Sequence, residues 1–174
     1  VRDRQSSDND KPFVDIVMTL STHEPFIILE GQEKYEQKAR EIFEKANVKN
    51  TKEKNIIQKN MNVFACYLYM DECINELINS YKKMGKYDNT IFIITGDHRM
   101  GMLNTGSTLR SFNVPLLIHS PLLNKNKQMD AVVSHYDLTP TINAYLSNNF
   151  DYKVDEYCHW LGHSLDTVEQ FRNN

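Results

Sequence analysis

Apolar and polar residues follow two different periods along this chain, and together these periods predict strands alternating with helices. Short, mostly apolar runs rich in β-branched residues lie at Pro12–Thr19, Thr90–Thr95, Val114–Ile118 and Met129–Val133. Such runs are typical of strands that a parallel sheet buries on both faces.

Apolar residues at helical spacing separate these runs. They predict one helix over Glu33–Lys45, a longer one over about Ile56–Met84, and a third over Thr139–Leu146. The lysine- and asparagine-rich stretch Asn47–Asn55 is predicted to be a break between the first two helices. Because strands and helices alternate, the pattern indicates an α/β fold with a mainly parallel sheet.

Three of the six histidines directly follow predicted strands. His23 lies in the loop after the first strand, His98 follows the second together with Asp97, and His135 follows the last. In α/β sheets, ligands bind at the carboxyl ends of the strands. These residues are therefore the first candidates for a functional site.

Asp97 and His98 form the clearest candidate pair. A carboxylate and an imidazole suit a metal such as zinc or manganese, and Gly96 permits a sharp turn that would let both side chains converge. The alternative is an acid that ends the strand by accepting hydrogen bonds from its own loop, with His98 as an exposed neighbour.

The other polar candidates also have simpler explanations. His23 can contact a phosphate or sulfate oxygen or carry a proton near neutral pH, or it can be a loop histidine with local partners. Arg110 can form bidentate hydrogen bonds with a tetrahedral oxyanion, or it can be a surface arginine without such a role. Asp137 is explained as the cap of the following helix, with His135 packed or bonded locally.

Composition excludes some functions. The 174 residues carry a formal net charge of -3, which does not favour nucleic acid, and no apolar run approaches the roughly 20 residues that span a bilayer. The three cysteines lack zinc-site spacing and are expected to be buried or idle thiols. Residues 1–11 are expected to be a loose lead-in, and residues 148–174 a tail that packs on the body of the domain.

Four motifs, in order and at sensible spacing, carry a family resemblance, and a fifth near the end supports it. They are "MTLSTHEPF" (Met18–Phe26), "NTIFIITGDH" (Asn89–His98), "VPLLIHSP" (Val114–Pro121), "VVSHYDLTPTI" (Val132–Ile142) and "WLGHSLDT" (Trp160–Thr167). Together they resemble the C-terminal half of a sulfatase-like catalytic domain of the alkaline phosphatase superfamily. The branch that the chain resembles most is that of the lipoteichoic-acid-synthase-like phosphoglycerol transferases of the bacterial cell envelope.

The resemblance implies a three-layer α/β/α sandwich with one divalent metal ion, Mn, Mg or Zn. Asp97 and His98 match the metal-binding pair of the family. A glutamate and a nucleophilic threonine would complete the site from the N-terminal half of the domain, outside this chain. His23 matches the histidine that contacts the phosphate-bearing group, and is the catalytic candidate of this chain.

The chain departs from the family directly after the metal-binding pair. Family members often have a second substrate-binding histidine a few residues on, whereas here no histidine follows until His119. Arg99 and Arg110 are the candidates to supply the missing positive contact with the substrate.

The function implied by the resemblance is transfer or hydrolysis of a phosphate ester, with phosphoglycerol transfer from a lipid-linked or glycan substrate as its specific form. Sulfate-ester hydrolysis is the alternative within the family, and a non-catalytic binding or structural domain is the alternative from another class. The expected partner is the N-terminal half of the same domain, without which this chain should have no turnover. By the same resemblance, the full-length protein would be extracytoplasmic and held by a membrane tether upstream of Val1.

Overall fold

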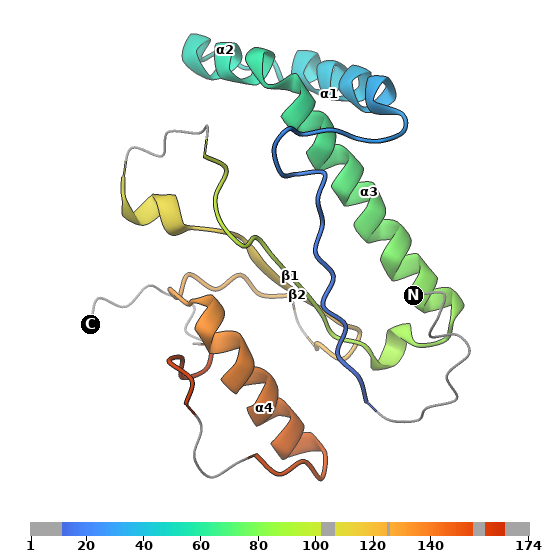
Figure 1. The fold of residues 1–174 in the computed structure, drawn as a ribbon, viewed down its shortest axis with the longest axis vertical. Helices are drawn as coiled ribbons and strands as arrows, with labels where there is room; N and C mark the ends of the chain where they lie inside the picture. Colours follow the sequence, from blue (N-terminus) through green and yellow to red (C-terminus); the bar gives the residue numbers. More distant parts are fainter. Residues whose placement is uncertain (1–11, 102–106, 125, 155–158, 166–174) are drawn as a thin grey trace. The chain divides into compact units, whose positions relative to one another are not determined.

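The computed structural model describes residues 12–101, 107–124, 126–154 and 159–165, and these divide into two compact units at residues 122 and 123. The first unit holds three α-helices and a strand pair, and the second holds one α-helix (Figure 1). The predicted lead-in at residues 1–11 and parts of the predicted tail lie outside the described residues.

Three helices account for the first half of the larger unit. They are α1 (Gln32–Ala46), α2 (Thr51–Lys59) and α3 (Met61–Lys83), and α1 packs against α3. The single helix predicted from Ile56 is wrong, because Asn60 leaves the helical conformation, with φ -122° and ψ 34°, and separates α2 from α3. Figure 1 shows α2 leading directly into α3.

The predicted break at Asn47–Asn55 is too long, because α2 begins within it, with Asn50 as its N-cap residue. The Asn50 side chain accepts hydrogen bonds from the backbone N–H groups of Lys52 and Glu53, at 3.0 and 3.4 Å. Such a cap satisfies amides that have no partner within the helix, and this offsets the low helix propensity of the asparagine- and lysine-rich stretch.

The core of the larger unit lies where α1, α3 and the chain entering α1 meet. Its buried members are Phe26, Ile28, Tyr35, Val63, Ala65 and Cys66, and three partly buried residues pack against them: Leu68, Tyr69 and Met100. Val63 and Cys66 are the largest side chains with less than 2% exposure. Burial raises the pKa of the Cys66 thiol, so this cysteine is a packed, unreactive group, as the sequence predicts.

A hydrogen bond from Tyr35 joins α1 to α3. The Tyr35 hydroxyl donates to Oε2 of Glu72 at 2.7 Å, and Lys34 Nζ lies 3.9 Å from Oε1 of the same carboxylate. The bond to Glu72, followed by burial, raises the pKa of Tyr35 to about 12. The same bond, followed by the charge of Lys34, lowers the pKa of Glu72.

Tyr35→Phe should therefore destabilise the full-length protein by about 1 kcal/mol at neutral pH, the usual contribution of one such bond. The elevated Tyr35 pKa gives stability that is complete below the unfolded value of about 10 and is lost as pH rises through about 12. The lowered Glu72 pKa gives stability that is complete above the ordinary pKa of a glutamate and is lost as pH falls through its lower folded value. Urea unfolding at pH 7 measures the loss of the bond in Tyr35→Phe, and the same measurement at pH 3 measures the contribution of ionised Glu72.

The matched control is Tyr67→Phe, since Tyr67 is on α3 but is 40% exposed. Its expected effect is below about 0.5 kcal/mol at either pH. Equal losses for the two variants would contradict the assigned role of the Tyr35–Glu72 bond.

The sheet of the described residues is a single antiparallel pair. Strand β1 (Phe92–Thr95) pairs with β2 (Leu116–His119), so that Phe92 lies opposite His119 and Thr95 lies opposite Leu116. The predicted parallel arrangement is wrong for this pair. Parallel neighbours need a crossover of roughly a dozen residues or more, usually through an α-helix. Between β1 and β2 the described residues contain only the one-turn 3₁₀ helix η3 (Leu109–Phe112).

Two predicted strands, Pro12–Thr19 and Met129–Val133, are not strands in the structure. The first is extended and runs beside α3, where the Tyr81 hydroxyl donates to Asp15 at 3.3 Å. Its apolar side chains are largely exposed, with Ile16 at 92%. A strand needs a neighbouring backbone to pair with, and the sheet of the described residues consists of β1 and β2.

The smaller unit is organised around Asp137, between η4 (His135–Asp137) and α4 (Leu138–Asn149). Asp137 accepts hydrogen bonds from Ser134 N and Oγ at 2.7 and 3.1 Å and from His163 N at 3.0 Å. Burial alone would raise the pKa of Asp137, but these bonds outweigh it and lower the pKa. Asp137 is the N-cap residue of α4, as predicted, but its side chain makes no cap bond to α4 and instead closes a capping box with Ser134 at the start of η4.

The described part of the tail bonds to the same region. Leu165 N donates to the Thr141 hydroxyl at 2.7 Å. A Cβ added at Gly162 would overlap the Tyr136 carbonyl group, so a glycine is required for this close approach.

The described helices and strand pair fit part of an α/β domain, and the three-layer sandwich remains a prediction. Among the described residues, no helix is both long and apolar enough to cross a bilayer.

Candidate metal centre

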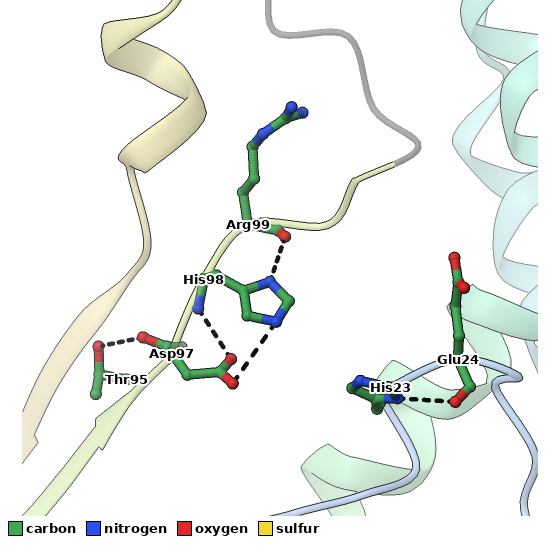
Figure 2. A network of polar contacts seen from close by, with 7 residues as sticks. His23, Glu24, Thr95, Asp97, His98 and Arg99 are labelled. Carbon is green, nitrogen blue, oxygen red and sulfur yellow. Dashed lines mark hydrogen bonds and ion pairs between the residues drawn. The ribbon is translucent and has the colours of Figure 1, made fainter.

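Asp97 and His98 follow the end of β1, with Gly96 between the strand and the pair. The preceding Thr95 anchors this end, because its hydroxyl donates to the Pro115 carbonyl oxygen at 2.9 Å. Both candidate side chains are well exposed, Asp97 at 79% and His98 at 69% (Figure 2). Gly96 does not adopt a positive φ, so the turn that brings Asp97 and His98 together does not use the left-handed conformation that glycine allows.

The hydrogen bonds of His98 determine which ring nitrogen faces Asp97. Nδ1 lies 2.8 Å from the Arg99 carbonyl oxygen, which can only accept, so Nδ1 carries the proton of the neutral ring. Nε2 then holds a lone pair, and it lies 3.7 Å from Oδ2 of Asp97. The other carboxylate oxygen, Oδ1, accepts from the His98 backbone N–H at 2.9 Å. This is the hydrogen bond between Asp97 and its own loop that the alternative interpretation of the sequence expected. It leaves the second carboxylate oxygen, Oδ2, directed toward the imidazole ring.

This geometry fits a shared metal ion. Ligand oxygen and nitrogen atoms lie about 2.0–2.2 Å from zinc, so two atoms that are 3.7 Å apart can both reach one ion. A ligating histidine typically donates its other ring N–H to a carboxylate or carbonyl, as His98 does to Arg99. Among the described residues no group of three or more acidic, histidine or cysteine side chains that could hold a metal ion occurs.

His23 occupies a compact double turn. Its backbone N–H donates to the Leu20 carbonyl oxygen at 3.0 Å, and its carbonyl oxygen accepts from Phe26 N at 2.8 Å. Its Nδ1 lies 2.8 Å from the Glu24 carbonyl oxygen, so the neutral ring again leaves the Nε2 lone pair exposed. His23 and His98 thus share one arrangement, in which Nδ1 is held by the next residue's carbonyl and Nε2 is left for a ligand or substrate.

Figure 2 draws the two histidines in one close-up, with the Asp97 carboxylate and the His98 ring on the side of their segment that faces His23. Within the described residues, no hydrogen bond or ion pair joins His23 to this pair. The Arg99 guanidinium points away from the pair in the same view.

The remaining candidates lie elsewhere. Arg110 is exposed within η3, and in the described part of the chain no hydrogen bond or ion pair joins it to Asp97 or His98. His135 lies in η4, in the other unit. The His119 Nε2 atom is 3.0 Å from the Tyr87 hydroxyl, and His119 pairs with Phe92 at the opposite end of β1 from Asp97 and His98.

Sequence reasoning missed Met100. The stretch after His98 registered only as a departure from the family pattern, whereas the structure packs Met100 against the core cluster. The available signal was a large apolar residue between Arg99 and Gly101, in a stretch that otherwise predicts an exposed loop.

Comparison with known proteins shows the family of this chain. The sulfatase family model matches residues 3–147. The chain belongs to the sulfatase family. It is 30% identical over 165 residues to the uncharacterized sulfatase YidJ of Escherichia coli K12, covering 81% of this chain and 33% of YidJ. It is 34% identical over 87 residues to the lipoteichoic acid synthase of Staphylococcus aureus USA300, covering 50% of this chain and 11% of the synthase.

These matches confirm the resemblance to the sulfatase-like branch of the alkaline phosphatase superfamily. The sulfatase-family chain spans about a third of the length of one relative and about a tenth of the other. No solved structure matches it.

Proposed function

We propose that the full-length protein is a metal-dependent enzyme that cleaves a phosphate ester and transfers a phosphoglycerol group. The observation that carries this is the 3.7 Å approach of Asp97 Oδ2 to His98 Nε2, with Nδ1 held by a backbone carbonyl. Membership of the sulfatase family supports ester chemistry, and the similarity to a lipoteichoic acid synthase supports the phosphoglycerol group.

Asp97 and His98 would hold one divalent ion, Mn, Mg or Zn, which when bound would neutralise charge on the transferring group and activate a hydroxyl nucleophile. Asp97 brings a full negative charge and His98 a neutral lone pair, which together are the donors that such ions accept. The nucleophile and the remaining ligands are proposed to come from the N-terminal half of the domain.

His23 would act on the substrate. Because its Nδ1–H is engaged by the Glu24 carbonyl, Nε2 is the atom that can accept a proton, or donate one when the ring is protonated, at an ester oxygen. Arg99 and Arg110 are proposed as further contacts with the oxyanion, and for Arg99 this requires its side chain to turn from the direction seen in Figure 2.

The exposed apolar segment Pro12–Leu20 supports the proposed partner. Val14, Ile16, Val17 and Met18 are each at least 66% exposed, which is unusual for a run of large apolar residues in a soluble unit. The N-terminal half of the same domain would cover them. In the full-length protein we place this domain outside the cytoplasmic membrane, tethered by an upstream segment.

A substrate comparison tests the function. With manganese present, the full-length protein should release diacylglycerol from phosphatidylglycerol in detergent, and should hydrolyse 4-methylumbelliferyl sulfate at least about 100-fold less efficiently, a difference of about 2.7 kcal/mol in transition-state stabilisation. The reverse order would favour sulfate-ester hydrolysis, which the match to YidJ over 81% of the chain makes the second candidate. Turnover of neither ester, with manganese bound, would favour a non-catalytic domain.

A further inference from the structure

Met100 connects the metal-binding segment to the core. It lies two residues after His98, is half-buried, and packs against the cluster formed by the chain entering α1, by α1 itself and by α3. Asp97 and His98 are both exposed and make their hydrogen bonds only with each other and Arg99 among the described residues. Met100 is therefore the first residue after the pair that packs on this cluster.

The same cluster holds the His23 turn. Phe26, three residues after His23, is only 7% exposed and belongs to the cluster. It adopts φ 58°, a left-handed conformation that costs a bulky L-residue about 1–2 kcal/mol. Burial of a phenylalanine side chain contributes more than this, so packing in the cluster holds the turn in its strained form. The two exposed imidazoles are thus attached to one core by Phe26 and Met100.

We propose that Met100 is a positioning residue, which through the shared cluster fixes where Asp97 and His98 lie relative to His23. The proposal rests on the proposed function, since it supposes that one ester group meets both the metal-binding pair and His23. Protein cores are close-packed and therefore transmit displacements from one side chain to another. A misplacement of about 1 Å between groups that act on one substrate can cost about 100-fold in rate.

Met100→Ala should lower kcat/KM for the phosphate ester by about 10- to 100-fold while manganese affinity stays within about twofold. The affinity is retained because the pair keeps its local bonds to each other and to Arg99, which do not involve the Met100 side chain. Met100→Leu, with similar volume, should restore most of the activity.

Leu68→Ala is the matched control. Leu68 packs against the same cluster from α3 and is likewise half-buried, but it is not attached to the metal-binding segment. It should lose a comparable amount of stability and leave kcat/KM within about threefold. Equal losses of kcat/KM in the two variants would show that Met100 acts only through stability, and would overturn the proposal.

A double-mutant cycle tests whether Met100 acts by positioning Asp97 and His98 relative to His23 or only by stabilising the fold. If Met100 acts by aligning the pair with His23, then Met100→Ala should have little further effect on kcat/KM in a His23→Ala background. Fully additive losses would overturn the proposal, because the two residues would then act independently.

Hydrogen exchange tests the connection without reference to activity. Met100→Ala should speed amide exchange in residues 97–101 and in residues 20–26 together, whereas Leu68→Ala should leave residues 97–101 unchanged. Faster exchange confined to residues 97–101 in Met100→Ala would overturn the connection. Absence of turnover in the unmodified protein would instead end the proposed function, and the exchange result would still decide whether the two segments are connected.

Discussion

Asp97→Ala should abolish stoichiometric metal binding by the full-length protein and lower ester turnover by more than about 100-fold, because loss of even a residue that supports a metal ligand costs about 10- to 100-fold. His98→Ala should do the same, since Oδ2 and Nε2 are the two atoms that can share the ion. Metal content after gel filtration, together with kcat/KM, measures both effects.

Asp88→Ala is the matched control for the metal-binding pair. Asp88 is an exposed aspartate in η2 (Tyr87–Asn89), before β1, whereas Asp97 follows the end of that strand. Its replacement should leave metal content and turnover unchanged. If Asp97→Ala and His98→Ala behave like this control, Asp97 and His98 are not the metal ligands and the enzymatic proposal for this chain loses its carrying observation.

Phe26→Ala should destabilise the protein by about 3–5 kcal/mol, the cost of removing a large aromatic side chain from a packed core. Phe26 is 7% exposed in the cluster that also holds Val63 and Cys66. The neighbouring Ile27 is 53% exposed, so Ile27→Ala should cost less than about 1 kcal/mol. Urea unfolding compares the two variants.

Phe26→Leu is a milder variant that keeps the test informative if Phe26→Ala does not fold. It keeps most of the apolar volume and should lose only about 1.5 kcal/mol. If Ile27→Ala proves as damaging as Phe26→Ala, the side chains of this turn are arranged differently and the His23 turn is not held by Phe26.

The pattern of apolar and polar residues predicted the helices and strands whose formation depends mainly on their own residues. The apolar spacing of α1 and α3 predicts both helices, because it creates a face that must be buried whatever the partner. The two short β-branched runs that became β1 and β2 are confirmed as strands for the same reason. The start of α2 was missed because a single cap at Asn50 decides it, and such a cap is weak in any averaged pattern.

Partners and directions could not be read from the pattern. Strand character does not say whether a neighbour runs parallel or antiparallel, and β1 and β2 run antiparallel. Pro12–Thr19 has strand composition but no place in the described sheet, because strand formation requires another backbone at its edge.

For the candidate site, the sequence by itself determined that Asp97 and His98 are neighbours at the end of a strand, since adjacency and strand ends are local properties. The direction of the His98 ring is also local, because the carbonyl group of the next residue holds Nδ1, but it depends on backbone angles that the residue pattern does not give. Only the tertiary structure decided that Met100 and Phe26 pack on one core, although 74 positions separate them in the chain. Packing between distant segments depends on how the chain returns on itself, and no local pattern encodes that return.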